Sequence, residues 1–160
     1  MNNLYLANIK TVISDFDGVL TDNSVIVSDK GNEYVSCSRS DGIGFNILFS
    51  KGIHCFILSS EISKIVQHRA RKMGVEAFNG VKNKKFFLQK YCKENHINLN
   101  QIAYIGNDLN DLEVMKIVGL PICPGDAWDE IKDISKIILN TNGGKGVIRE
   151  FSSIISKKIK

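Results

Sequence analysis

Hydrophobic residues along the chain form short apolar runs that alternate with longer amphipathic stretches from one end to the other. This alternation is typical of a central parallel sheet flanked by helices, and it predicts a single α/β domain spanning residues 1–160. The strands are expected near residues 10–16, 53–58, 76–78, 102–105, 120–123 and 136–139. The helices are expected near residues 42–51, 62–73, 84–94, 110–117, 127–131 and 146–157, with Asp126 as a capping residue before the fifth.

The pattern changes between Ser24 and Ser36. Two short runs of β-forming residues, 25–27 and 33–35, flank a polar segment there. This arrangement predicts a β-hairpin that projects from the loop after the first strand. No repeat, low-complexity segment or linker interrupts the rest of the chain.

Composition is that of an ordinary compact domain, with 43% hydrophobic and 24% charged residues. A chain of 160 residues buries about two thirds of its unfolded surface, so it does not need disulfides. Its four cysteines are scattered without a CxxC pair, and we interpret them as reduced thiols. No apolar stretch reaches the length of a membrane span and no signal-peptide core is visible, so we expect no membrane partner and a cytoplasmic location.

The net charge of +4 has local sources, among them the cluster of Lys82, Lys84 and Lys85. A nucleic-acid-binding surface would carry a pI above the value of about 8.8 found here, together with aromatic residues among the lysines. Nucleic acid is therefore not an expected partner. An anionic small substrate explains the lysine cluster better.

Two carboxylates, Asp15 and Asp17, follow the first predicted strand directly. Gly18 breaks the strand, so both acids can converge beyond its carboxyl end, where open parallel sheets bind ligands. Paired acids suit Mg²⁺ together with substrate phosphate oxygens, and one of them can act as a nucleophile. The alternative interpretation is a solvated turn rich in Asp and Gly.

Two further strand ends carry candidate phosphate-binding residues. Ser59 follows the second parallel strand and can donate to a phosphate oxygen, although a serine there can also cap a helix. No GxSxG motif surrounds Ser59, so it is not expected to be a nucleophile. Lys84 enters a helix where a lysine can meet the phosphate, with Lys82 as the rival. Alternatively, all three lysines of the cluster face solvent.

The segment GNDLND, residues 106–111, opens a helix after another strand and offers metal ligands. The amide oxygen of Asn107 can bind Mg²⁺ but brings no charge. Asp108 or Asp111 could restore that charge, directly or through water. In isolation the same segment could be an ordinary helix start.

In this order, the four segments resemble the signatures of the haloacid dehalogenase superfamily of phosphohydrolases, a resemblance that covers nearly the whole chain. The segments are DFDGVLTD at residues 15–22, the serine after the second strand, glycine 80 with a lysine four residues later, and GND at residues 106–108. The resemblance implies a Rossmann-like fold in which Asp15 attacks phosphorus and Asp17 serves as acid and base. It also implies that Ser59 and Lys84 contact the phosphate.

The same resemblance implies that Mg²⁺ is the cofactor, with Asp15, Asp17, Asn107 and Asp108 as candidate ligands. Many relatives carry an acid where this chain has Asn107. The identity of the third protein ligand therefore stays open.

The resemblance narrows to a subgroup without a cap domain, the phosphatases of 3-deoxy-2-keto sugar acid phosphates. Supporting segments are SDG at residues 40–42 and GGKGVIREF at residues 143–151. Members of this subgroup resemble one another in forming homotetramers with the hairpins at the centre. The resemblance therefore implies a homotetramer for this chain, with active sites that include residues across a subunit interface. The alternative is a monomer with an exposed hairpin.

Two substrates are expected from the subgroup: 3-deoxy-D-manno-octulosonate 8-phosphate, which feeds lipopolysaccharide, and a nonulosonate 9-phosphate related to sialic acid. The octulosonate enzymes resemble one another in carrying Arg where this chain has Glu61 and Ser40, which favours the nonulosonate type. Glu61, Arg69 and Lys72 would lie on one helix face and could bind the sugar acid. A salt-bridged surface face is the alternative.

Two other functions are alternatives to a phosphatase. A signalling receiver domain would need an Asp at the end of its third strand, and neither candidate segment supplies one. A catalytically silent oligomerisation module, of the kind that ends some sialic acid activating enzymes, stays open because of Asn107.

Overall fold

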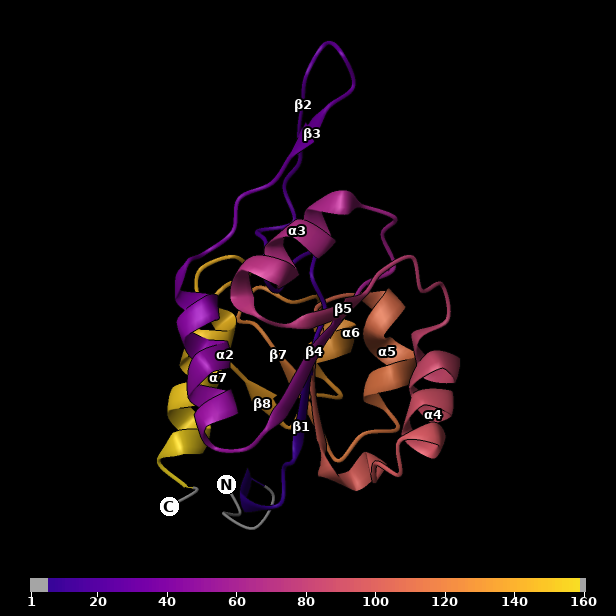
Figure 1. Ribbon diagram of the computed structural model, residues 1–160, viewed down its shortest axis with the longest axis vertical. Coiled ribbons are helices and arrows are strands. Elements are labelled where there is room, and N and C mark those ends of the chain that lie inside the picture. The colour runs from indigo at the N-terminus through magenta and orange to yellow at the C-terminus, as the bar shows by residue number, and fades with distance from the viewer. Residues whose placement is uncertain (1–5, 159–160) are drawn as a thin grey trace.

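The computed structural model describes residues 6–158, which form one central sheet with helices on both faces (Figure 1). Six parallel strands lie in the order β5-β4-β1-β6-β7-β8, so the first strand is near the middle of the sheet. Val12 of β1 pairs with Cys55 on one side and with Ala103 on the other. The strands are β1 (Thr11–Ser14), β4 (His54–Leu58), β5 (Glu76–Phe78), β6 (Ile102–Ile105), β7 (Leu120–Cys123) and β8 (Ile137–Ile138).

Two hydrophobic clusters cover the two faces of this sheet. Val12 belongs to a cluster with buried residues of α2, α3 and α7, whereas Ile13 belongs to a cluster with residues of α4, α5 and α6. Successive strand residues point to opposite faces, so these two sets of helices form separate layers. The helices are α2 (Ser40–Ser50), α3 (Lys64–Met73), α4 (Lys84–Glu94), the 3₁₀ turn η1 (Leu99–Gln101), α5 (Leu109–Met115), α6 (Asp129–Lys132) and α7 (Val147–Ser156).

The predicted fold class is confirmed, and the predicted strands and helices lie within a few residues of the observed ones. The prediction for the fifth helix was wrong in detail. Helix α6 begins at Asp129, and Trp128 precedes it without a side-chain cap. Asp126 instead accepts a hydrogen bond from the backbone N–H of Gly143, at 2.9 Å, and so fixes a loop rather than a helix start.

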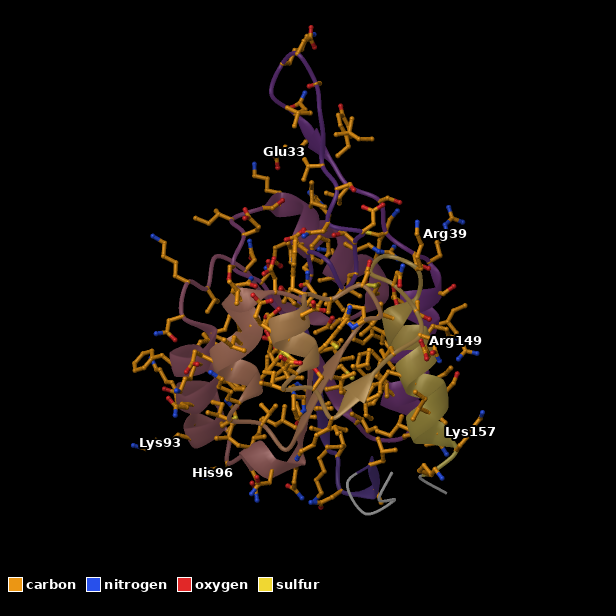
Figure 2. All side chains as sticks on the ribbon, turned by 180° about the vertical axis from the view of Figure 1, so that it is seen from behind. Glu33, Arg39, Lys93, His96, Arg149 and Lys157 are labelled. Atoms are coloured by element: carbon orange, nitrogen blue, oxygen red, sulfur yellow. The ribbon has the colours of Figure 1, made fainter. Side chains whose placement is uncertain are left out.

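A hairpin projects from the body of the domain (Figures 1 and 2). Strands β2 (Ile26–Val27) and β3 (Glu33–Tyr34) pair antiparallel, as the sequence predicted. Its apolar side chains are exposed, with Ile26 at 71% and Tyr34 at 56%. No cap domain is present between β1 and β4. Within residues 6–158, no helix has both the length and the apolar character needed to cross a bilayer.

Helices α2 and α7 meet closely at a glycine and at a buried acid. A Cβ atom at Gly44 would lie 2.7 Å from the backbone N of Arg149, so the two helix backbones can approach only because Gly44 has no side chain. Asp41 accepts a hydrogen bond of 2.9 Å from the N–H of Ile148, in the first turn of α7. Burial raises the pKa of Asp41 to about 6. The negative carboxylate is favoured by the positive end of α7.

We predict that Gly44→Ala lowers the free energy of unfolding by about 1–3 kcal/mol, because the new methyl group overpacks the contact between the helices. Gly42→Ala is the matched control: its Cβ would lie 3.6 Å from Met73, an ordinary contact, and alanine favours a helix over glycine. Thermal and urea unfolding of both variants measures the difference. Equal stability of the two variants would contradict the assignment of Gly44 to a tight helix crossing.

Candidate active site

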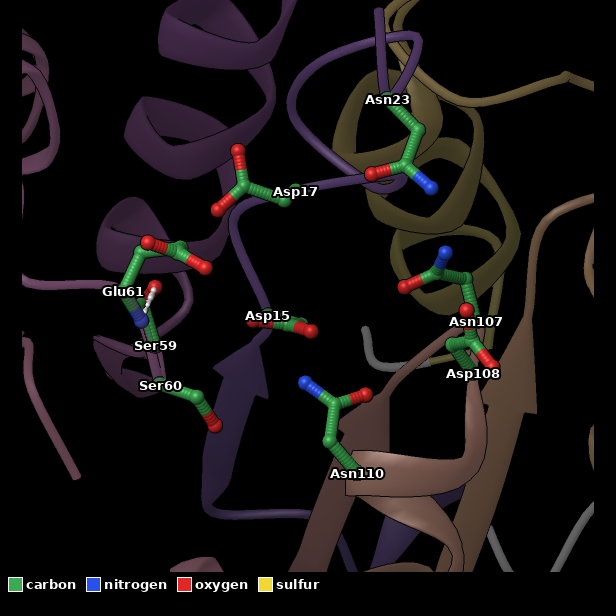
Figure 3. Close-up of a pocket in the computed structure, with 9 residues that line it drawn as sticks. All are labelled: Asp15, Asp17, Asn23, Ser59, Ser60, Glu61, Asn107, Asp108 and Asn110. Carbon is green, nitrogen blue, oxygen red and sulfur yellow. Dashed lines mark hydrogen bonds between the residues drawn. The ribbon is translucent and has the colours of Figure 1, made fainter. Parts of the chain in front are cut away.

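Asp15 and Asp17 lie in the loop that leaves the carboxyl end of β1, between the ends of β4 and β6. The N–H of Asp15 donates to the carbonyl of Ile105 at 2.9 Å, which extends the sheet pairing into the loop. Gly18 then turns the chain with a φ of 79°, in the left-handed region that favours glycine. Both acids consequently line one pocket of about 340 Å³ (Figure 3).

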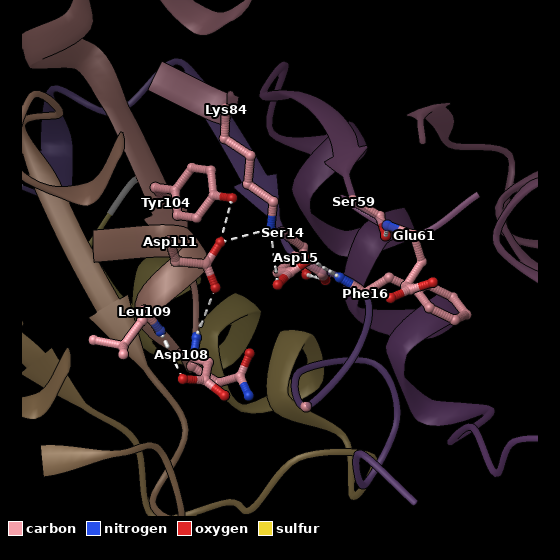
Figure 4. A network of polar contacts seen from close by, with 12 residues as sticks. Ser14, Asp15, Phe16, Ser59, Glu61, Lys84, Tyr104, Asp108, Leu109 and Asp111 are labelled. Carbon is pink, nitrogen blue, oxygen red and sulfur yellow. Dashed lines mark hydrogen bonds and ion pairs between the residues drawn. The ribbon is translucent and has the colours of Figure 1, made fainter. Parts of the chain in front are cut away.

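The first acid is held by a buried lysine (Figure 4). Lys84 Nζ lies 2.9 Å from Asp15 Oδ2 and 2.7 Å from Asp111 Oδ1, and Lys84 is only 2% exposed. Burial opposes its charge, but the two carboxylates outweigh burial and raise the pKa of Lys84, so the ammonium stays protonated. Lys82, the rival candidate, is exposed. The structure therefore brings Lys84, and not Lys82, to Asp15.

Asp111 is fully buried and connects this lysine to the neighbouring loop. Its Oδ1 accepts hydrogen bonds from Lys84 and from the hydroxyl of Tyr104, at 2.8 Å, and its Oδ2 accepts one of 3.0 Å from the N–H of Asn107. Both oxygens are thus occupied by protein donors, and Asp111 does not line the pocket. Asp111 thus orients Lys84 from behind the pocket, and this arrangement favours Asn107 and Asp108, which line the pocket, as the candidate metal ligands.

Asn107 fits the position of the third metal ligand. The residue is 6% exposed, and its side-chain Oδ1 is buried without a hydrogen-bond partner in the described chain. Figure 3 shows this amide directed toward the space around Asp15 and Asp17. A Cβ on Gly18 would lie 1.9 Å from Asn107 Nδ2, so the glycine is needed for this close approach. An orphaned oxygen opposite two carboxylates suits a hard cation such as Mg²⁺.

Asp108 lines the same pocket but also caps α5, because its Oδ1 accepts the N–H of Leu109 at 2.7 Å. Within residues 6–158, no cluster of three or more His, Cys, Asp or Glu side chains is placed to hold a metal ion. A metal here would therefore depend on the neutral amide of Asn107 beside Asp15 and Asp17. Whether Asp108 joins them stays a prediction.

Ser59 is 1% exposed and is fixed at the end of β4 by backbone bonds to the next strand. Its N–H donates to Phe78 O at 2.9 Å, and its carbonyl accepts from Val81 N at 3.0 Å. Its Oγ accepts the N–H of Glu61 at 3.2 Å, which leaves the hydroxyl hydrogen available to a ligand. Ser59 thus lines the pocket as a donor close to Asp15.

The acidity of Asp17 is set by its surroundings. Partial burial raises the pKa of Asp17, and the negative charges of Glu61 and Glu33 raise it further, while Lys84 opposes them. A raised pKa keeps a carboxyl group protonated up to a higher pH, as a proton donor to a leaving group requires. Burial and the nearby carboxylate of Asp111 raise the pKa of Asp15 as well, and the direct ion pair with Lys84 opposes that rise.

The three residues expected to bind the sugar acid do not come together in one chain. Helix α3 begins at Lys64, so Glu61 lies in the preceding loop and the shared helix face was a wrong expectation. Glu61 lines the pocket above Asp15. Arg69 and Lys72 line a separate hollow of about 510 Å³, where Arg69 donates to Ser38 O at 2.6 Å.

Sequence reasoning missed two residues of this region. Tyr104 looked like an ordinary buried strand residue, and only its three-dimensional contact with Asp111 shows its polar role. Asn23 lines the pocket as well, and the only signal in the sequence was its place directly after the DFDGVLTD segment.

The loop that carries the two acids is supported from behind by a segment near the C-terminus. Gly144 donates its N–H to the carbonyl of Val19 at 3.0 Å. A Cβ on Gly143 would lie 2.3 Å from the carbonyl oxygen of Gly18, so only glycine fits there. The segment GGKG, which the sequence singled out, therefore positions the candidate active site without lining its pocket.

Comparisons with known proteins agree with this geometry. Residues 56–151 match the model of the haloacid dehalogenase-like hydrolases. The chain is 34% identical over 151 residues to the 3-deoxy-D-manno-octulosonate 8-phosphate phosphatase of Haemophilus influenzae, covering 94% of this chain and 84% of that protein.

Crystal structures extend the likeness to nearly the whole chain. The phosphatase of that name from Moraxella catarrhalis, in complex with a magnesium ion, a phosphate ion and KDO, superposes with a TM-score of 0.93 at 30% identity and covers 98% of this chain and 91% of its own. The enzyme of that name from Yersinia pestis superposes with a TM-score of 0.92 at 28% identity, covering 98% of this chain and 85% of its own.

We predict that Asn107→Asp tightens Mg²⁺ binding by about 10-fold, because a carboxylate replaces a neutral ligand beside Asp15 and Asp17. Isothermal titration of the protein with MgCl₂, without substrate, measures the change. Asn110→Asp is the matched control, since it adds the same charge to the pocket lining away from the orphaned oxygen. Equal effects of the two variants would show that Asn107 is not a ligand.

Proposed function

Because the chain belongs to the haloacid dehalogenase-like hydrolase family, we propose that it is a phosphatase acting on a 3-deoxy-2-keto sugar acid phosphate. One observation carries this proposal: a buried lysine bridges the carboxylate of Asp15 and a second acid at the floor of a pocket that Ser59 and Asn107 also line. This arrangement presents a nucleophile, a cation and neutral donors to a phosphoryl group.

The reaction proceeds in two steps on the side chains of this site. Asp15 attacks phosphorus in line and forms an aspartyl phosphate, while Asp17 donates its proton to the oxygen of the departing sugar. Water then attacks the phosphorus, with Asp17 accepting its proton, and phosphate leaves with Asp15 regenerated. Lys84 and Ser59 stabilise the negative charge on the transferring oxygens.

Asp15, Asp17 and Asn107 would hold Mg²⁺, with Asp108 beside them. The ion supplies positive charge that neutralises the phosphate and lets it approach the carboxylates. The Moraxella phosphatase was solved with magnesium and phosphate together, which supports this cofactor for the present chain. The orphaned oxygen of Asn107 supports the same choice.

Octulosonate 8-phosphate is the first candidate substrate, because the relatives described above act on it. A nonulosonate 9-phosphate is the second candidate, and the acidic Glu61 in the pocket lining favours it. A pocket lined by Asp15 and Ser59, with Lys84 paired to Asp15 beneath it, supports the phosphatase over the assembly-module alternative that Asn107 left open.

We propose further that the protein is a homotetramer held by its hairpins. The hairpin carries four apolar side chains that are 51–71% exposed: Val25, Ile26, Val27 and Tyr34. Contact with further copies of the chain would remove this apolar surface from water. In such an assembly Arg69 and Lys72 would reach the sugar acid bound to a neighbouring subunit. A cytoplasmic location fits the four cysteines, all of which are free thiols.

Asp15→Asn is predicted to lower kcat by on the order of 10³-fold or more without unfolding the protein, because the amide fills the same space but is a poor nucleophile. Mg²⁺-dependent phosphate release from octulosonate 8-phosphate and from a nonulosonate 9-phosphate, measured in parallel, tests the function and names the substrate. Asp133→Asn, at the exposed end of α6, is the control. Activity retained by Asp15→Asn would end the assignment.

The tetramer has its own test. Ile26→Asp should convert the assembly to smaller species in size-exclusion chromatography with light scattering, because a buried carboxylate without a partner is costly. Ile138→Asp places the same substitution at another exposed isoleucine, on β8, and should leave the mass unchanged. A wild-type protein that runs as a monomer would refute the proposed assembly.

A further inference from the structure

Asn23 has an unusual backbone at the mouth of the candidate active site. Its φ is 62°, in the left-handed region, and among residues 6–158 only His96 shares this property outside glycine. Asparagine tolerates this conformation better than most residues, at a cost that glycine avoids. The N–H of Asn23 donates to Thr21 Oγ1 at 3.2 Å, so its backbone is fixed relative to the loop of the two acids.

The side chain of Asn23 stands where two pockets meet. It lines the pocket of about 340 Å³ over Asp15 and also a second pocket of about 200 Å³ that leads toward the hairpin. Asp17 and Glu61 are the other residues common to both linings. In the view of Figure 3, Asn23 and Asp17 lie on one side of Asp15, and Ser60 and Asn110 lie on the other. In the proposed reaction, a leaving group protonated by Asp17 would depart toward this side.

The second pocket is short of hydrogen-bond donors. Its charged lining groups are Asp17, Glu33 and Glu61, and the remainder of its lining is mostly apolar. An ionised carboxylate only accepts hydrogen bonds, whereas a sugar hydroxyl both donates and accepts. The side-chain amide of Asn23 makes no hydrogen bond within the described part of the chain, so its NH₂ group is available as a donor.

We propose that Asn23 is a specificity-determining residue that hydrogen-bonds a hydroxyl of the leaving group, close to the carbon that carries the phosphoester. The carboxylates around it accept from the same polyol, and Asn23 supplies the complementary donor. The site therefore selects phosphate esters of polyhydroxylated alcohols over esters whose leaving group has no hydroxyl. This inference rests on the proposed phosphatase function and deepens it.

A purely conformational role for Asn23 can be separated from this one. Glycine adopts a φ near +60° without strain, so Asn23→Gly keeps the backbone and removes only the amide. Asn23→Ala would combine the loss of the amide with backbone strain and is less informative.

The experiment compares kcat/KM of wild type and Asn23→Gly on three phosphate esters: octulosonate 8-phosphate, sorbitol 6-phosphate and p-nitrophenyl phosphate, whose leaving group has no aliphatic hydroxyl. We expect Asn23→Gly to lose about 5- to 10-fold on the two polyol esters, mainly through KM, and to act on p-nitrophenyl phosphate like wild type. Ser50→Gly, at an exposed position at the end of α2, should change none of the three.

A loss of equal size on all three esters would show that Asn23 is structural and would overturn the proposal, as would no loss on any of them. Failure of the substrate assignment looks different. Wild type would then hydrolyse sorbitol 6-phosphate but not octulosonate 8-phosphate, and the comparison between sorbitol 6-phosphate and p-nitrophenyl phosphate would still decide the role of Asn23.

Discussion

The buried ion pairs of Lys84 are the interaction on which the site depends. An ammonium group that is almost fully removed from water needs carboxylate partners, and here it has two, Asp15 and Asp111. These partners come from the ends of β1 and the start of α5, so they meet only if β1 and β6 are adjacent and parallel. The order of the sheet is therefore also the condition for placing the carboxylate of Asp15 beside a fixed positive charge.

The side chains that line the pocket carry negative charge and would repel a phosphate group. None of the nine side chains that line it is cationic, whereas Asp15, Asp17, Glu61 and Asp108 are acidic. Lys84 lies beneath this lining and is already shared by two carboxylates. A phosphate dianion approaching these acids would be repelled, and a cation held at the orphaned oxygen of Asn107 would reduce that repulsion.

Sequence predicted the parallel sheet, the projecting hairpin and the loops that carry Asp15, Ser59 and Lys84, because strand ends leave clear local patterns. The sequence did not predict roles that depend on the direction in which a side chain points. Whether Asp111 faces a metal or a lysine is decided by the first turn of α5, and the polar contact of Tyr104 is invisible in a buried strand. Glu61 was misplaced because α3 starts at Lys64, two residues later than the amphipathic pattern indicated.

The support of the acidic loop by Gly143 and Gly144 has a consequence for biosynthesis. A ribosome makes residues 15–22 long before it makes the glycines that fix them. The first strands of a nascent chain can thus pair while the loop of residues 15–22 still lacks its contacts with Gly143 and Gly144. The site would be complete only after α7 has packed against α2. Competence for catalysis would then coincide with completion of the fold.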